Sequence, residues 1–142
     1  MKTFTYLAFD FGTQKIGIAI GRQYLRQAQA VEDIRCPRQK PDWGRIDQLL
    51  KDWEANALVV GLPISMDGSD NAITKLARRF GDQLRGRYNL PVHMVDERLT
   101  SHAARHSLQD AGVSSQRIRR QGVDKYAARE ILQTYLNQLD KP

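Results

Sequence analysis

Four acidic residues of this chain stand at positions where a carboxylate has a specific chemical use. Asp10 interrupts the apolar run "YLAFDF", Asp96 and Glu97 end a second run, "LPVHMVDE", and Asp124 opens "VDKYAAREIL". Burying a carboxylate costs several kcal/mol unless it is paired with a cation or ligates a metal. The positions of these acids therefore suggest a site that uses their charge.

Oxygen ligands favour Mg²⁺ or Mn²⁺ over Zn²⁺, and the chain has no Cys or His at a fitting spacing for zinc. Three carboxylates at one place repel one another unless a cation holds them. Two such ions about 4 Å apart activate a water molecule and stabilise the leaving oxygen in phosphodiester hydrolysis. We expect two ions, held by Asp10, Asp124 and the Asp96–Glu97 pair.

Each acid also has a structural explanation. Asp124 suits the start of a helix, where capping and the helix dipole favour a negative charge. Asp96 or Glu97 can pair with Arg98, and Asp10 can cap the turn that follows it. Taken together in a basic chain, the acids favour the metal site over three separate coincidences.

The elements that would position these acids follow from hydrophobic periodicity and turn residues. "KIGIAIG" puts isoleucines on one face and Gly17, Ala19 and Gly21 on the other, so we expect another element to pack closely on the small face. Ser69 or Asp70 is expected to cap the helix that follows it. We predict strands at 4–11, 15–21, 27–35, 57–63 and 90–97, and helices at 43–55, around 73–84, 101–109 and 123–139.

This order predicts an α/β protein with a mixed five-stranded sheet, in which an antiparallel three-stranded meander is followed by parallel strands. Helices cover both faces. The pattern is that of the ribonuclease H-like fold, and we expect residues 1–142 to form one such domain. Functional groups of α/β sheets gather beyond the carboxyl ends of the strands. Asp124 lies on the apolar stripe of the last helix, so we expect that helix to aim it at those ends.

The charge of the chain indicates a polyanionic partner. Its net charge is +6 and its pI is about 9.7, which favours nucleic acid. Arg117, Arg119 and Arg120 form the densest basic cluster, which either contacts phosphate or forms a solvated loop. Arg98 either binds phosphate or pairs with a neighbouring acid. No signal peptide or membrane span is recognised, so we expect a cytoplasmic protein without a membrane partner.

Four motifs, "AFDFGTQKIGIAIG", "LVVGLPISMDGSD", "VDERLTS" and "VDKYAAREIL", occur in this order. Together they resemble the YqgF/RuvX family, from about residue 5 to 136. Its members are called pre-16S rRNA nucleases or Holliday-junction resolvases, and the resemblance implies a ribonuclease H-like fold and divalent-metal nuclease activity. The family's acids fall on Asp10, Glu97 (with Asp96 beside it) and Asp124. The family commonly has Lys-Arg after the glycine turn; this chain has Gln14–Lys15, which leaves Lys15 for phosphate contact.

The resemblance implies an endonuclease that acts on structured nucleic acid, foremost on the 5′ end of pre-16S rRNA in the pre-ribosomal small subunit. The alternatives are a Holliday-junction resolvase, an actin-like ATPase domain with a similar "DFGT" hairpin, and a non-catalytic nucleic-acid-binding assembly factor. The sequence leaves a monomer and a homodimer open. Junction cutting would need two sites in a symmetric pair.

Overall fold

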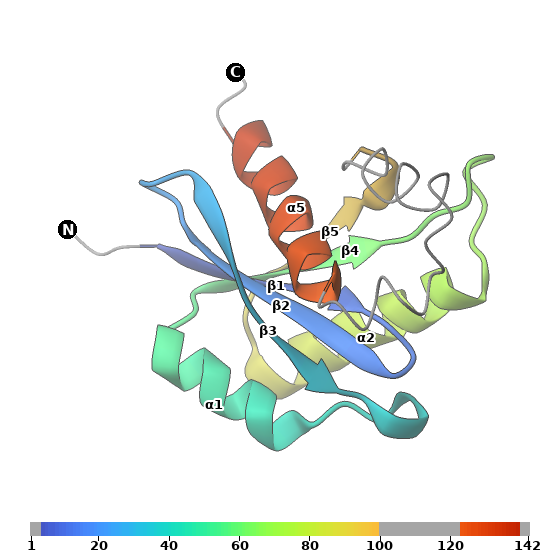
Figure 1. Cartoon of the computed structure of the whole chain (residues 1–142), viewed down its shortest axis with the longest axis horizontal. Helices are drawn as coiled ribbons and strands as arrows, with labels where there is room; N and C mark the ends of the chain where they lie inside the picture. The colour runs from blue at the N-terminus through green and yellow to red at the C-terminus, as the bar shows by residue number, and fades with distance from the viewer. Residues whose placement is uncertain (1–3, 100–122, 140–142) are drawn as a thin grey trace.

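The structure, a computed structural model, describes residues 4–99 and 123–139 (Figure 1). The helix predicted at 101–109 and the arginines at 117, 119 and 120 lie outside these residues. The elements are β1 (Thr5–Phe11), β2 (Lys15–Arg22), β3 (Gln27–Arg35), η1 (Pro37–Gln39), α1 (Trp43–Trp53), β4 (Ala57–Leu62), α2 (Ala72–Tyr88), β5 (Val92–Asp96), η2 (Glu97–Leu99) and α5 (Val123–Gln138).

The five strands form one sheet in the order β3-β2-β1-β4-β5. β1 pairs with β2, and β2 with β3, in antiparallel fashion, whereas β1–β4 and β4–β5 are parallel. This is the predicted mixed sheet of a ribonuclease H-like fold. Because β1, β4 and β5 are parallel, their carboxyl ends lie at the same edge of the sheet.

Helices cover both faces of the sheet, as predicted: α5 lies on one face, and α1 and α2 lie on the other (Figure 1). β2 explains how α5 fits so closely. Its isoleucines point to the α1–α2 side, and its small residues point to α5. A β-carbon added at Gly21 would lie 3.0 Å from Leu132 Cδ2 and 3.1 Å from Leu136 Cδ1. The small face therefore allows α5 to pack directly against the strand.

The start of α2 differs from the sequence-based expectation. Neither Ser69 nor Asp70 caps the helix; the cap is Asn71, whose side chain accepts a hydrogen bond from Thr74 N at 3.0 Å. Asn71 N donates in return to Thr74 Oγ1 at 3.1 Å, which completes a capping box. Asp70 instead forms an ion pair with Arg78 at 2.8 Å, so its carboxylate is engaged by a side chain from the second turn of the helix.

Among the described residues, none of the helices combines the length and the apolar character needed to cross a membrane.

Candidate carboxylate site

Asp10 lies on the α5 face near the carboxyl end of β1, and only 7% of its surface is exposed. Its orientation follows from strand alternation, because Tyr6 and Ala8 pack in the α5 core while Phe9 packs on the other face. Gly17 of β2 is its registered partner. On the opposite side, the pairing of β1 with β4 ends one residue before Asp10 and one residue before Gly61. Asp10 and Gly61 therefore lie at the same level of the sheet. Asp10 thus lies between two strands that carry glycine at its level.

Glu97 lies above one of these glycines. It begins η2, directly after β5, and is 4% exposed. A β-carbon at Gly61 would lie 3.2 Å from the carboxyl carbon of Glu97, and it would collide with Cδ1 of Ile131 in α5. Glu97 therefore extends over Gly61 on the α5 face, the face that also holds Asp10. The structure brings these two predicted acids to the same edge and face of the sheet.

The direction of α5 places its first turn toward this edge. Tyr135, late in the helix, packs edge-on against Tyr6 at the start of β1, with ring centroids 5.3 Å apart. Ile131 lies over Gly61, closer to the carboxyl end of the parallel strands. Asp124 is in the first turn, about 10 Å along the axis before Ile131. Its side chain is outside what the structure describes.

Asp96 is held differently from Glu97. Its Oδ2 forms an ion pair with Arg98 Nη2 at 2.7 Å, and Arg98 Nε donates to the same oxygen at 3.0 Å. This hydrogen-bonded carboxylate raises the pKa of Arg98. Of the two readings of Arg98, the structure shows the pairing; its contact with phosphate stays a prediction. Arg98 also lies beside the 63–71 loop, where a β-carbon at Gly68 would be 3.7 Å from its Nη1.

The other basic residues predicted for the site lie at its border or beyond the described part. Lys15 begins β2 directly after the β1–β2 turn and is half-buried. Gln14, before it, accepts a hydrogen bond from Cys36 N at 2.8 Å, which ties this turn to the end of β3. The structure therefore places Lys15 near the carboxyl end of β1.

Asp33 is an acid that the sequence interpretation did not select. It is registered opposite Gly17 on β3, so Asp33, Gly17 and Asp10 form one row across the sheet. Ile34 packs on the α1–α2 face, and alternation places Asp33 on the α5 face.

Within the described ranges, 4–99 and 123–139, there is no cluster of three or more Asp, Glu, His or Cys side chains that could hold a metal ion. Two of the three predicted ligands, Asp10 and Glu97, lie at the carboxyl edge of the sheet on the α5 face. The side chain of the third, Asp124, is not described. The observed donors are carboxylate oxygens beside glycines that add no side chain. This donor set fits a hard divalent cation rather than zinc.

A family model described as "RuvX: Holliday junction resolvase" matches residues 4–138. The chain is 46% identical to a Nitrosococcus oceani protein over 132 residues, 93% of this chain and 86% of the relative. It is 42% identical to a Coxiella burnetii protein, covering 93% and 92%, and 45% identical to one from Marinobacter nauticus, covering 91% and 90%. All three relatives bear the name "Putative pre-16S rRNA nuclease".

Solved structures of the Thermus thermophilus protein RuvC are similar in fold. One, in complex with a Holliday junction substrate, aligns with a TM-score of 0.54 at 12% identity, covering 96% of this chain and 95% of that one. A second aligns with a TM-score of 0.52 at 14% identity, covering 96% of both. At this identity the likeness concerns the fold.

Proposed function

This chain belongs to the RuvX family, and on that premise we propose that it is a nuclease that hydrolyses phosphodiester bonds of structured nucleic acid with the help of Mg²⁺ or Mn²⁺. In this proposal residues 1–142 form one nuclease domain. The supporting comparisons are the family match over residues 4–138 and the relatives named as nucleases.

The observation that carries the proposal is the convergence of Asp10 and Glu97. They come from strands separated by β4, yet both lie on the α5 face at the carboxyl edge of the sheet. Both side chains are nearly removed from solvent. Two carboxylates buried at one edge repel each other, and a divalent cation relieves that repulsion.

We assign the metal-binding role to Asp10, Glu97 and Asp124. Glu97 is preferred to Asp96 because Glu97 extends over Gly61, whereas Asp96 is paired with Arg98. When bound there, divalent ions would lower the pKa of an attacking water and stabilise the leaving oxygen of the phosphodiester.

The chain's own residues hold the site in shape. Gly61 leaves room for the Glu97 carboxylate, and Ile131 closes the space above the same glycine. The Asp96–Arg98 pair fixes the turn that begins with Glu97 and holds a guanidinium near the site for a phosphate group. In this proposal Lys15, which begins β2 after the β1–β2 turn, contacts a phosphate of the substrate.

For the substrate, we propose the 5′ end of pre-16S rRNA, because the relatives at 42–46% identity bear that name. Branched DNA is the second candidate, favoured by the family description and by the fold of the RuvC–junction complex. The two substrates differ in symmetry. A four-way junction is cut at two symmetric positions and calls for a homodimer, whereas trimming one RNA end needs a single site.

The remaining alternatives predict different behaviour. An ATPase would be stabilised thermally by nucleotide, whereas a nuclease of this kind would not. A non-catalytic assembly factor would bind RNA and cut nothing. The non-catalytic alternative does not need two buried carboxylates at one edge of the sheet.

The deciding experiment is a cleavage assay that offers both a pre-16S rRNA 5′ fragment and a four-way DNA junction, with and without Mg²⁺. Asp10→Asn should abolish cleavage and leave binding within about twofold, because the substitution removes a metal ligand and little surface charge. Asp52→Asn, an exposed acid on α1, is the matched control and should cut like the wild type. Persistent cleavage by a clean Asp10→Asn preparation would overturn the metal-nuclease proposal.

A further inference from the structure

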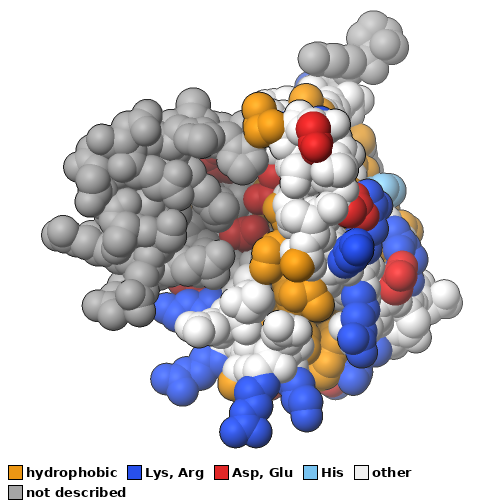
Figure 2. Space-filling model, turned by 90° about the vertical axis from the view of Figure 1, so that its right-hand side faces the viewer, with side chains coloured by type: hydrophobic (Ala, Val, Ile, Leu, Met, Phe, Trp, Pro, Cys, Tyr) orange, Lys and Arg blue, Asp and Glu red, His pale blue; other side chains and the backbone are white. Residues whose placement is uncertain are grey.

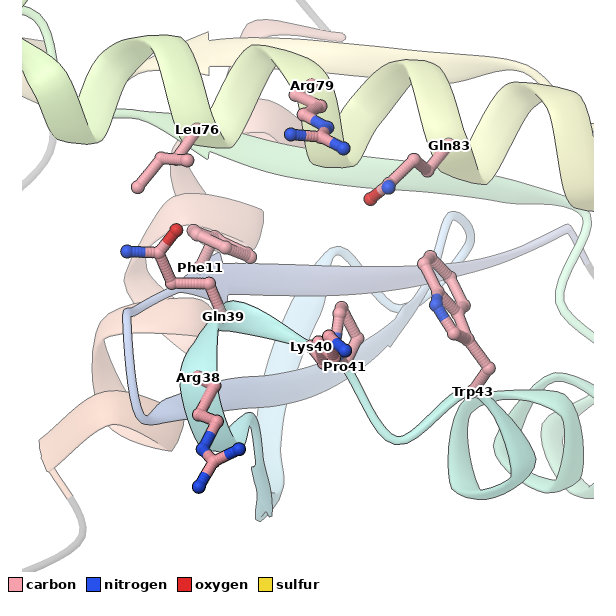
Figure 3. A pocket seen from close by; sticks show the side chains of 9 residues that line it. All are labelled: Phe11, Arg38, Gln39, Lys40, Pro41, Trp43, Leu76, Arg79 and Gln83. Atoms are coloured by element: carbon pink, nitrogen blue, oxygen red, sulfur yellow. The ribbon is translucent and has the colours of Figure 1, made fainter.

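A separate pocket lies on the opposite face of the sheet, between α2 and the 36–42 loop that precedes α1 (Figure 3). It has a volume of about 480 Å³. Its cationic side chains are Arg38 and Lys40 from the loop and Arg79 from α2, accompanied by the amides of Gln39 and Gln83. None of the described side chains that line it is acidic. We call this the loop pocket.

The side chains of the loop pocket come from two sides. In Figure 3, Arg79 and Gln83 reach from α2 toward the loop that carries Lys40, and Arg38 extends outward at the rim. Phe11 of β1 lies between the two sides, so the pocket has an apolar wall under its polar groups. This arrangement presents hydrogen-bond donors from opposite directions to one ligand.

The cationic side chains of the loop pocket form no salt bridge within the described part of the fold. The adjacent Arg78 pairs with Asp70 at 2.8 Å, so α2 does form ion pairs where an acid is near. By contrast, no salt bridge joins Arg38, Lys40 or Arg79 to any residue within 4–99 and 123–139. Three cations around one cavity create a positive potential that attracts an anion.

The loop is held in a strained and fixed form. Arg38 and Gln39 have φ values of 53° and 63°, a left-handed conformation that non-glycine residues adopt at an energetic cost. The loop is anchored at Cys36, which is fully buried and donates its backbone N–H to Gln14 O at 2.8 Å. This conformation sets the direction in which two adjacent polar side chains leave the backbone at the cavity.

The loop pocket and the carboxylate site lie at the same end of β1. Asp10 faces α5, and the next residue, Phe11, faces the loop pocket, since successive strand residues point to opposite faces. The β1–β2 turn, followed by Lys15, comes directly after these two residues in the chain. Figure 2 views this side of the molecule and shows Lys and Arg side chains projecting along its lower margin, the height at which the 36–42 loop lies in Figure 1.

We propose that the loop pocket binds a backbone phosphate of the nucleic-acid strand that continues past the cleavage site around this end of the sheet. The inference rests on the proposed nuclease function and adds a second contact region to it. Cations from two elements would bind a phosphate, and the amides would bind its ester oxygens. A base-specific contact is not required. The pocket would therefore lengthen the binding site without making it selective for a base sequence.

The test uses the double variant Lys40→Gln/Arg79→Gln in the Asp10→Asn background, so that probes are not cut. The matched control is Lys51→Gln/Lys75→Gln, which removes the same charge from exposed positions on α1 and α2 outside the pocket. The probes are fluorescein-labelled RNA hairpins, and DNA counterparts, with single-stranded extensions of increasing length. Thermal melting checks that every variant is folded.

With an unaltered loop pocket, longer extensions should tighten binding. Lys40→Gln/Arg79→Gln should remove that gain. It should weaken binding of the extended probe about tenfold and leave binding of the short probe unchanged. Its slope of log K against log salt should also fall by about 0.7, the value for one single-strand phosphate contact. The control pair should weaken all probes alike. Equal losses from both double variants would reduce the pocket to general charge attraction and overturn the proposal.

A second arm separates a strand phosphate from a small anion. Inorganic phosphate and ATP are titrated in thermal shift, and stabilisation by either that is lost in Lys40→Gln/Arg79→Gln would identify a small-molecule site and overturn the strand assignment. These binding measurements do not depend on cleavage, so failure of the pocket proposal and failure of the nuclease proposal can be told apart. Length-dependent binding through the pocket by a wild type that never cleaves would sink the nuclease function and leave the pocket standing.

Discussion

The carboxyl carbon of Glu97 lies 3.2 Å from the point where a β-carbon of residue 61 would stand, and that residue is a glycine. Cδ1 of Ile131 from α5 lies closer still to that point, within clashing distance of it. Glu97 and Gly61 are therefore coupled: the glutamate extends inward, over the neighbouring strand, because the strand has no side chain at that level.

Gly61→Ala should disturb stability and activity together. The added methyl group must displace Ile131 or Glu97, and overpacking of this kind costs about 1–3 kcal/mol. We expect a lower Tm in calorimetry and a loss of cleavage larger than the fraction unfolded explains. Gly86→Ala is the control, because nothing lies within 4 Å of its β-carbon and it is in α2; it should raise stability by about 0.5–1 kcal/mol. Unaltered cleavage by folded Gly61→Ala would argue against a metal-binding Glu97.

Glu97→Gln and Asp96→Asn should separate the two adjacent acids. Loss of a metal ligand should cost more than the roughly 10–100-fold typical of a supporting residue. We therefore expect more than about 100-fold from Glu97→Gln. Asp96→Asn releases Arg98 and should cost about tenfold, mostly as a higher KM. Steady-state kinetics at saturating Mg²⁺ decide between them, and the reverse ranking would make Asp96 the ligand.

Divalent ions should stabilise the folded protein. Binding to the native state alone adds about 2.7 kcal/mol at an ion concentration 100 times Kd, so Mg²⁺ or Mn²⁺ should raise Tm. The rise should disappear in Asp10→Asn and Glu97→Gln. A wild-type Tm that is unchanged by both ions would count against the metal site.

The basic cluster at Arg117, Arg119 and Arg120 should govern salt dependence. Replacing all three with Gln should weaken binding to every substrate and lower the slope of log K against log salt by about 2–3, as expected for three lost phosphate contacts. The Lys51→Gln/Lys75→Gln control should change the slope much less. An unchanged slope in the triple variant would remove this segment from the interface.

The sequence was sufficient for the sheet because its signals are local. An unbroken apolar run marked β4, an apolar run interrupted only by Asp10 marked β1, and alternation in β2 separated its two faces. Small residues on one of those faces predicted the close approach of another element, and α5 lies there. Each local pattern agreed with the global arrangement, which is why the mixed sheet, an antiparallel meander followed by parallel strands, could be predicted before any contact was known.

The sequence did not identify the α2 cap correctly, because several residues before the helix suit the role. Ser69, Asp70 and Asn71 are all good capping residues, and propensity does not rank them reliably. Asn71 is the cap since Thr74 can return its hydrogen bond, while Arg78 engages Asp70. The choice depended on partners three to eight residues away.

Sequence alone determined that acids stand at the ends of buried strands and that the chain as a whole is basic. Only the tertiary structure decided that Glu97, and not Asp96, extends over Gly61, and that Arg38, Lys40 and Arg79 meet around one cavity. The reason is physical: burial and strand alternation are encoded by neighbouring residues, whereas the meeting of side chains from separate elements depends on register and helix packing, which form only when the chain is folded.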